Sequence, residues 1–157
     1  MALSQHLSRQ LREFYFGGNW TESSYFDMLK DVDWPSASAK GRFTANSIAA
    51  LAYHIHFYVA AQRKVLEGGP LESSDRDAFA HPPIASEADW QGLLGKAKED
   101  AEALAALIEA LPEERFHETF VSERYGTYYR NIAGMIEHSY YHLGQIALLK
   151  KEVSGTN

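Results

Sequence analysis

Helical periodicity, interrupted by glycine and proline, is the feature that most constrains what this chain can fold into. Apolar residues recur every three or four positions through four long segments, which is the spacing of a helix with one buried face. The segments run from Leu3 to Phe16, from Thr44 or Asn46 to Glu67, from Ser86 to Leu111, and from Thr127 to about Lys151. Their number and lengths predict an all-α fold, a four-helix bundle with one or two long crossover connections.

Residues that start and stop helices support these limits. Gly17–Gly18, Gly68–Gly69–Pro70 and Pro112 follow the first three segments, and Ser86 is the expected N-cap of the third. The expected connections are a short helical piece over Ser23–Lys30, a linker around Pro35, a polar loop over Leu71–Ala85, and an irregular hairpin or extended crossover over Phe116–Tyr125. The tryptophans are expected to be packing anchors: Trp20, Trp34 and Trp90.

Length and composition limit the classes of protein that the chain could belong to. With 157 residues, it is expected to form one domain over residues 1–157. The net charge of −6 lacks the basic excess of a nucleic-acid-binding domain. The longest apolar stretch, Ile48–Ala61, is too short to span a bilayer, and Met1–Arg12 has no signal-peptide core. We therefore expect a cytoplasmic protein that binds neither nucleic acid nor membrane.

Cysteine is absent from the chain, and this restricts its chemistry. Disulfides, thiolate metal ligands and an intrinsic thiol nucleophile are all excluded. Any thiol that takes part in a reaction must therefore arrive as a cosubstrate.

Two histidines four residues apart lie on one face of the last predicted helix. By the helical period, His138 and His142 share this face with Asn131, Met135, Gln145, Ile146 and Leu149. The apolar members mark it as the side that faces the bundle interior. Two imidazole rings in that position each need a polar partner.

The second predicted helix carries two histidines that cannot share a face. His54 lies beside the apolar side that includes Ile55 and Val59, whereas His56 falls with Arg63 on a side expected to be solvated. The pattern therefore predicts three inward histidines on two helices, namely His54, His138 and His142.

Three histidines are the number of protein ligands in many catalytic zinc sites, and they leave coordination positions open for water or substrate. An all-nitrogen ligand set suits zinc, nickel, iron or copper and does not by itself choose among them. We expect zinc or nickel, with iron or copper as alternatives. The side chains expected around the ligands or in a cavity beside them are Tyr58, Asn131, Ser139, Tyr141 and Gln145. The alternative is a set of stacked core or surface histidines without a metal. The pair is not a zincin motif, because Ser139 stands where that motif has glutamate.

Four stretches of the sequence resemble the DinB-like (YfiT-like) metal-binding proteins. NSIAALAYHIHFYVAAQ, Asn46–Gln62, is similar to their second helix, and MIEHSYYHLGQIALLK, Met135–Lys150, is similar to their closing helix. FGGNWTESSYFDMLKDV, residues 16–32, and SEADW, Ser86–Trp90, are similar as well. The feature that makes this resemblance specific is the combination of an early histidine with a late His-x-x-x-His pair. Gly-Gln-Ile, residues 144–146, follows that pair.

The resemblance implies a four-helix bundle in which one divalent metal is bound by a histidine of the second helix and the pair of the fourth. The residues that match are His54, His138 and His142. It also implies a homodimer. From thiol-dependent relatives it implies a reaction of a low-molecular-weight thiol, such as bacillithiol, mycothiol or glutathione, with a small electrophilic substrate. The DNA-damage association in the family name does not imply DNA binding.

Three hypotheses of function follow from the sequence. The first is a metal-dependent enzyme of the thiol S-transferase or hydrolase kind. The second is a non-catalytic metal-binding or sensor bundle, which the lack of a clear general base on the ligand faces favours, since Glu137 projects about 100° away from His138. The third is a structural, dimer-forming bundle whose histidines are merely buried.

Overall fold

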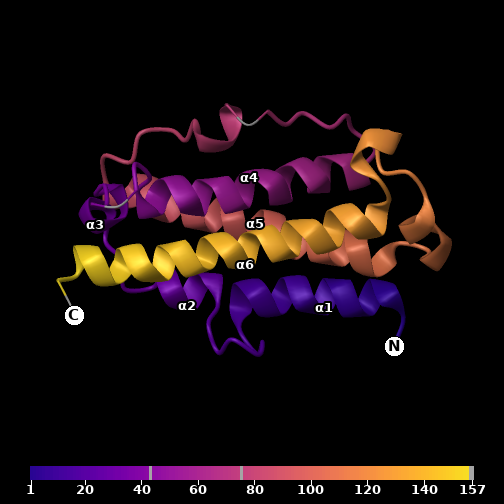
Figure 1. Cartoon of the computed structure of the whole chain (residues 1–157), viewed down its shortest axis with the longest axis horizontal. Helices are drawn as coiled ribbons and strands as arrows, with labels where there is room; N and C mark the ends of the chain where they lie inside the picture. The colour runs from indigo at the N-terminus through magenta and orange to yellow at the C-terminus, as the bar shows by residue number, and fades with distance from the viewer. Residues whose placement is uncertain (43, 75, 156–157) are drawn as a thin grey trace.

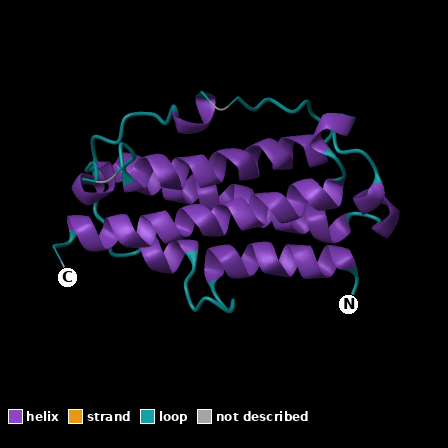
Figure 2. Ribbon diagram, viewed as in Figure 1, coloured by secondary structure: helices purple, strands orange, loops and turns teal. Residues whose placement is uncertain are grey.

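Four long helices make up most of the structure, a computed structural model that describes residues 1–42, 44–74 and 76–155. They are α1 (Leu3–Phe16), α4 (Ile48–Leu66), α5 (Glu87–Ala110) and α6 (Tyr128–Val153), as Figure 1 shows. The connections contain α2 (Tyr25–Leu29), α3 (Trp34–Ser38) and three 3-10 turns, η1 (Asp77–Phe79), η2 (Glu113–His117) and η3 (Glu123–Tyr125). The described residues form no strand (Figure 2). The predicted all-α four-helix bundle is confirmed.

The four helices pack in a closed ring, in which each long helix contacts two neighbours. α1 packs against α5 and α6, and α4 packs against the same two helices from the other side. α4 and α5 run in the same direction, so the chain between them travels back along the whole bundle and carries η1 over α4 (Figure 1). This segment is the predicted long crossover. None of the helices described combines the length and the apolar character needed to cross a lipid bilayer.

Hydroxyl caps start the three longest helices. The side-chain oxygens of Ser47, Ser86 and Thr127 accept hydrogen bonds from the backbone N–H groups three residues on, at 3.1, 3.2 and 3.2 Å. Each cap satisfies a backbone donor that the helix itself leaves unpaired, which contributes about 1 kcal/mol. These caps set the direction in which α4 and α6 enter the bundle, and those two helices carry the histidines.

Two connections differ from the sequence-based expectation. The linker around Pro35 contains a short helix, α3, because the Asp33 side chain caps it and proline is tolerated in the first turn. The expected hairpin over Phe116–Tyr125 is reduced to a single antiparallel bridge between Thr119 and Thr127, within a segment of 3-10 turns.

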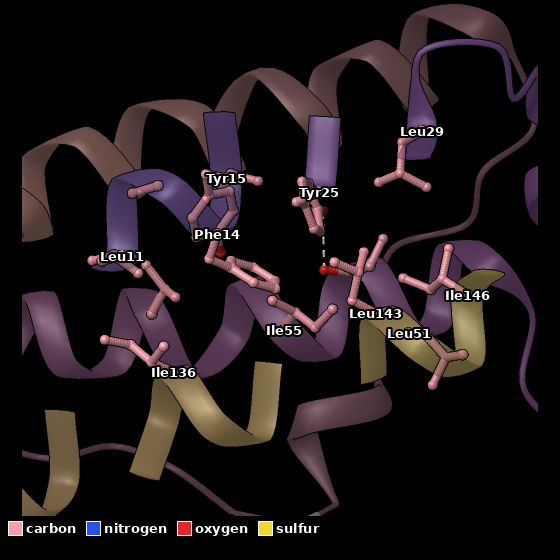
Figure 3. Close-up of a cluster of buried hydrophobic side chains, with 14 of the residues drawn as sticks. Leu11, Phe14, Tyr15, Tyr25, Leu29, Leu51, Ile55, Ile136, Leu143 and Ile146 are labelled. Atoms are coloured by element: carbon pink, nitrogen blue, oxygen red, sulfur yellow. Dashed lines mark hydrogen bonds between the residues drawn. The ribbon is translucent and has the colours of Figure 1, made fainter. Parts of the chain in front are cut away.

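Aromatic and aliphatic side chains from α1, α2, α4, α5 and α6 fill the core, and Figure 3 shows a part of it. Phe14, Tyr15 and Tyr25 are fully buried, and the Tyr25 hydroxyl donates a hydrogen bond to the Ala52 carbonyl at 3.2 Å. Trp90 is also fully buried, and its indole Nε1 donates to the Val32 carbonyl at 2.8 Å. The prediction that Trp20 is a packing anchor is wrong, because its side chain is fully exposed.

The prediction that His56 faces solvent is also wrong. Only 8% of His56 is exposed, and its Nε2 lies 2.6 Å from Oδ2 of the buried Asp100 on α5. Arg63 donates to the other oxygen of the same carboxylate at 2.5 Å. The face of α4 that was expected to be solvated therefore packs against α5, where Asp100 pairs with His56 and Arg63 of α4. Burial by itself would raise the pKa of Asp100, but the hydrogen bonds from His56 and Arg63 outweigh it and lower that pKa.

Candidate metal centre

Three imidazole rings from two helices converge inside the bundle. His54 comes from α4, and His138 and His142 come from successive turns of α6. One ring nitrogen of each residue lies within 4.8 Å of those of the other two, and the Nε2 atoms of His54 and His138 are 3.0 Å apart. His54 and His142 are 5% and 7% exposed, and His138 is half-buried. The structure therefore brings together the three residues that the sequence selected.

The crossover segment fixes the orientation of His54. The Nδ1 of this ring lies 3.1 Å from the Ala78 carbonyl oxygen, and the Phe79 ring stacks on it with centroids 3.9 Å apart. A carbonyl oxygen can only accept a hydrogen bond, so Nδ1 carries the proton and the lone pair stays on Nε2. That lone pair points toward His138.

A side-chain amide lies against the ring of His142, with its oxygen facing Nδ1. The His142 Nδ1 lies 2.6 Å from the Oε1 of Gln145, and the Nε2 of Gln145 donates to the Tyr141 hydroxyl at 3.2 Å. With Nδ1 protonated, the lone pair of His142 is on Nε2 as well. Such outer hydrogen bonds orient metal-binding histidines in many proteins.

The surroundings of His138 keep its ring neutral. Burial, together with the neighbouring His142, lowers the pKa of His138 below its usual value of 6.5. The Tyr58 ring is nearly perpendicular to the rings of both His54 and His138, with centroids 5.1 and 5.3 Å away. Neutral imidazoles are the protonation state that a metal ion requires.

The donor set fits a divalent transition metal. Three neutral nitrogen ligands without a carboxylate suit zinc, nickel, iron or copper and not calcium or magnesium, which prefer oxygen ligands. Three protein ligands also leave coordination positions for a substrate or water. In the alternative of histidines without a metal, the Nε2 of His54 would accept a hydrogen bond from the Nε2 of His138, which lies 3.0 Å away.

The other side chains predicted around the ligands have different roles. Tyr58 and Asn131 line a cavity beside His138, and Tyr141 and Gln145 support His142. The Asn131 side chain donates to the carbonyls of Tyr125 and Thr127 at 2.8 Å, so it shapes the wall and does not reach the rings.

The expectation for Ser139 is wrong, because its hydroxyl donates back to the Met135 carbonyl at 2.7 Å within α6. Sequence reasoning missed Ala78 and Phe79. A backbone carbonyl has no residue signature, and the loop that carries it is placed over α4 only by the fold. It also missed Gln62 and Arg130, which line the cavity.

Comparison with known proteins gives one family match. The model of the DinB superfamily matches residues 23–146, a range that includes α4, α5 and all three histidines but not α1. No curated protein and no solved structure matches the chain. Because the family match covers most of the 157 residues, and the helical fold and the histidine triad agree with it, the chain belongs to the DinB superfamily.

Proposed function

We propose that this protein holds one divalent metal ion, zinc or nickel, and is a metal-dependent enzyme that transfers a low-molecular-weight thiol to a small electrophile. His54, His138 and His142 are the ligands. The observation that carries the proposal is the convergence of three ring nitrogens within 4.8 Å, two of them held in the required tautomer by outer hydrogen bonds.

The chemistry follows from the residues around the triad. A divalent ion bound there supplies Lewis acidity and lowers the pKa of a thiol or water molecule that reaches it. Ala78 and Gln145 hold two rings in place, and the stacked Phe79 ring shields His54 from solvent. His138 forms part of a cavity wall and so provides the access route for substrates.

Thiol transfer is better supported than hydrolysis. Hydrolysis commonly uses a side chain that takes a proton from water, and no carboxylate is among the described residues that line the cavity beside His138. The Glu137 carboxylate lies on a different surface, beside Tyr140 and Trp20. A thiol would depend less on such a base, because its ordinary pKa of about 8.5 is far below that of water, about 15.7, before a bound ion lowers either. The absence of cysteine from the chain agrees with a thiol that enters as cosubstrate.

A non-catalytic metal-binding or sensor function is the second candidate. The absence of a carboxylate among the described residues that line the cavity favours it too, because the site could hold an ion without a proton acceptor. The two candidates differ in turnover and not in metal content.

Metal analysis tests the ligand assignment. Freshly purified protein is expected to contain about one equivalent of zinc or nickel per chain, and His138→Ala about a tenth of that or less, since two imidazoles rarely retain an ion. His117→Ala is the matched control, because His117 is an exposed histidine on η2. An unchanged metal content in His138→Ala would sink the metal proposal.

Turnover tests the enzymatic part. The metal-loaded protein is incubated with glutathione, bacillithiol or mycothiol and a panel of epoxides, alkyl halides and activated alkenes. The thioether product is then measured by mass spectrometry. Product formation that disappears in His138→Ala and persists in His117→Ala supports the transferase. Full metal content without product across the panel favours the sensor.

The homodimer and the cytoplasmic location belong to the same proposal. They rest on the family, and on the reduced state of low-molecular-weight thiols in the cytoplasm. Light scattering coupled to gel filtration is expected to give the mass of two chains. A monomer that is still active would remove the dimer from the proposal.

A further inference from the structure

A cavity of about 500 Å³ lies between α4 and the start of α6, with His138 in its wall. Its size is in the range of sites for small molecules. Tyr58 and Gln62 of α4 form one side, and residues of η3 and the first turns of α6 form the other. A molecule bound there would touch His138.

The charged side chains that line the cavity are two arginines. Arg124 and Arg130 both line it, and within the described part of the chain neither guanidinium has a carboxylate within 4.0 Å. Guanidinium groups bind carboxylates through paired hydrogen bonds, so an anionic ligand suits this wall.

A glycine leaves space for one of these guanidinium groups near the triad. A Cβ atom built on Gly134 would lie 2.5 Å from Nη1 of Arg130, so the arginine side chain lies across the helix where Gly134 has no side chain. Gly134 precedes His138 by four residues, about 6 Å along the axis of α6. The positive charge therefore lies about one helical turn from the candidate metal ligand.

A buried acceptor stands on the opposite side of the cavity. Gln62 is 8% exposed, and its Nε2 donates to the Asn131 carbonyl at 2.9 Å. A carbonyl cannot donate, so this bond fixes which end of the amide is nitrogen, and Oε1 must be the free end. Oε1 is fully buried and has no hydrogen-bond partner within the described residues. Buried acceptors are nearly always paired, so this atom is suited to an N–H donor of a ligand.

We infer that the cavity binds a small carboxylate that also carries an amide N–H, as an N-acyl amino acid does. Arg124 and Arg130 bind its carboxylate, Gln62 Oε1 accepts its N–H, and its reacting end faces His138. The inference deepens the proposed function and rests on it for the role of the ligand as a substrate. The binding site itself uses residues that do not ligate the metal.

Three small probes test the recognition without any mutation. N-acetylglycine has both groups, its methyl ester lacks the carboxylate, and acetoxyacetate replaces the N–H with oxygen at nearly the same shape. Affinities are measured by NMR titration of zinc-loaded and of chelator-treated protein. N-acetylglycine is expected to bind about tenfold or more tightly than either analogue, because each analogue leaves a protein group unpaired.

Variants then assign each preference to its residue. The double variant Arg124→Gln/Arg130→Gln is expected to lose the preference for the acid over its ester. Gln62→Leu is expected to lose the preference for the amide over acetoxyacetate. Arg9→Gln is the matched control, since Arg9 is an exposed arginine of α1 outside the cavity. None of these changes is expected to alter the metal content.

The titrations of zinc-loaded and of chelator-treated protein separate this inference from the metal proposal. Selective binding that persists after chelation supports the cavity whether or not the ion is present. Equal affinity for the three probes overturns the inference. So does binding that requires zinc and is unchanged in the double arginine variant, because the ion alone would then hold the carboxylate.

Discussion

Gln145 offers the sharpest test of how the triad is built, because it orients a ligand without being one. Its Oε1 accepts the Nδ1–H of His142 at 2.6 Å and so keeps the lone pair of that ring on Nε2. Gln145→Leu removes the acceptor. Gln145→Glu keeps an acceptor at the same place and adds a charge that strengthens the bond.

The magnitude follows from the bond that is lost. A net hydrogen bond contributes about 1–1.5 kcal/mol, which corresponds to about a tenfold change in affinity. The ring also becomes free to rotate and to change tautomer, and outer-sphere substitutions at metal sites typically cost about 10–100-fold. Gln145→Leu is therefore expected to weaken zinc binding by 10–100-fold. The leucine itself is accommodated, because Leu148 and Leu149 line the same hollow as Gln145.

The assay is a competition titration in which a chromophoric chelator and the protein share a limiting amount of zinc. Gln91→Leu is the control, since Gln91 is an exposed helical glutamine whose amide bonds a residue four positions earlier. The reasoning is refuted if Gln145→Leu binds zinc as tightly as the wild type. It is equally refuted if the leucine and glutamate variants lose the same affinity.

Three further predictions concern pH, the polar cluster and the core. Because burial and His142 lower the pKa of His138, zinc is expected to be retained on dialysis at pH 6.5 and released only as more acidic buffer protonates His138; release near pH 7 contradicts this. Asp100→Ala is expected to lower the free energy of unfolding by about 2–3 kcal/mol, less than for a fully buried pair because its arginine partner can reach water. Glu99→Ala, at a side chain 65% exposed, is expected to change little in the same denaturant titration. The Asp100 contribution is present above about pH 4 and is lost as pH falls through its lowered pKa, so the two unfolding curves should converge in acid. Trp90→Phe is expected to cost about 1–2 kcal/mol through the unpaired Val32 carbonyl, whereas Trp20→Phe should leave thermal unfolding unchanged.

The sequence alone determined the helices and most of their ends. Periodicity, capping hydroxyls and glycine or proline breaks act within one segment, over a few residues, so they can be read without knowing the fold. The same local geometry placed His138 and His142 on one face of α6 and separated His54 from His56 on α4. The all-α class and the three histidines that converge were therefore accessible from spacing, although spacing wrongly placed His56 in solvent.

Only the tertiary structure decided which surfaces meet. The burial of His56 depends on Asp100, which is distant in sequence and on another helix, and nothing on α4 itself shows it. The support of His54 comes from a backbone carbonyl of the crossover, a group that every residue possesses. The unpaired oxygen of Gln62 and the guanidinium of Arg130 become parts of one cavity only when α4 and α6 pack side by side. Helix periodicity reports which side of a helix is apolar, but the partner across the interface is a non-local property, and that partner sets the chemistry of the site.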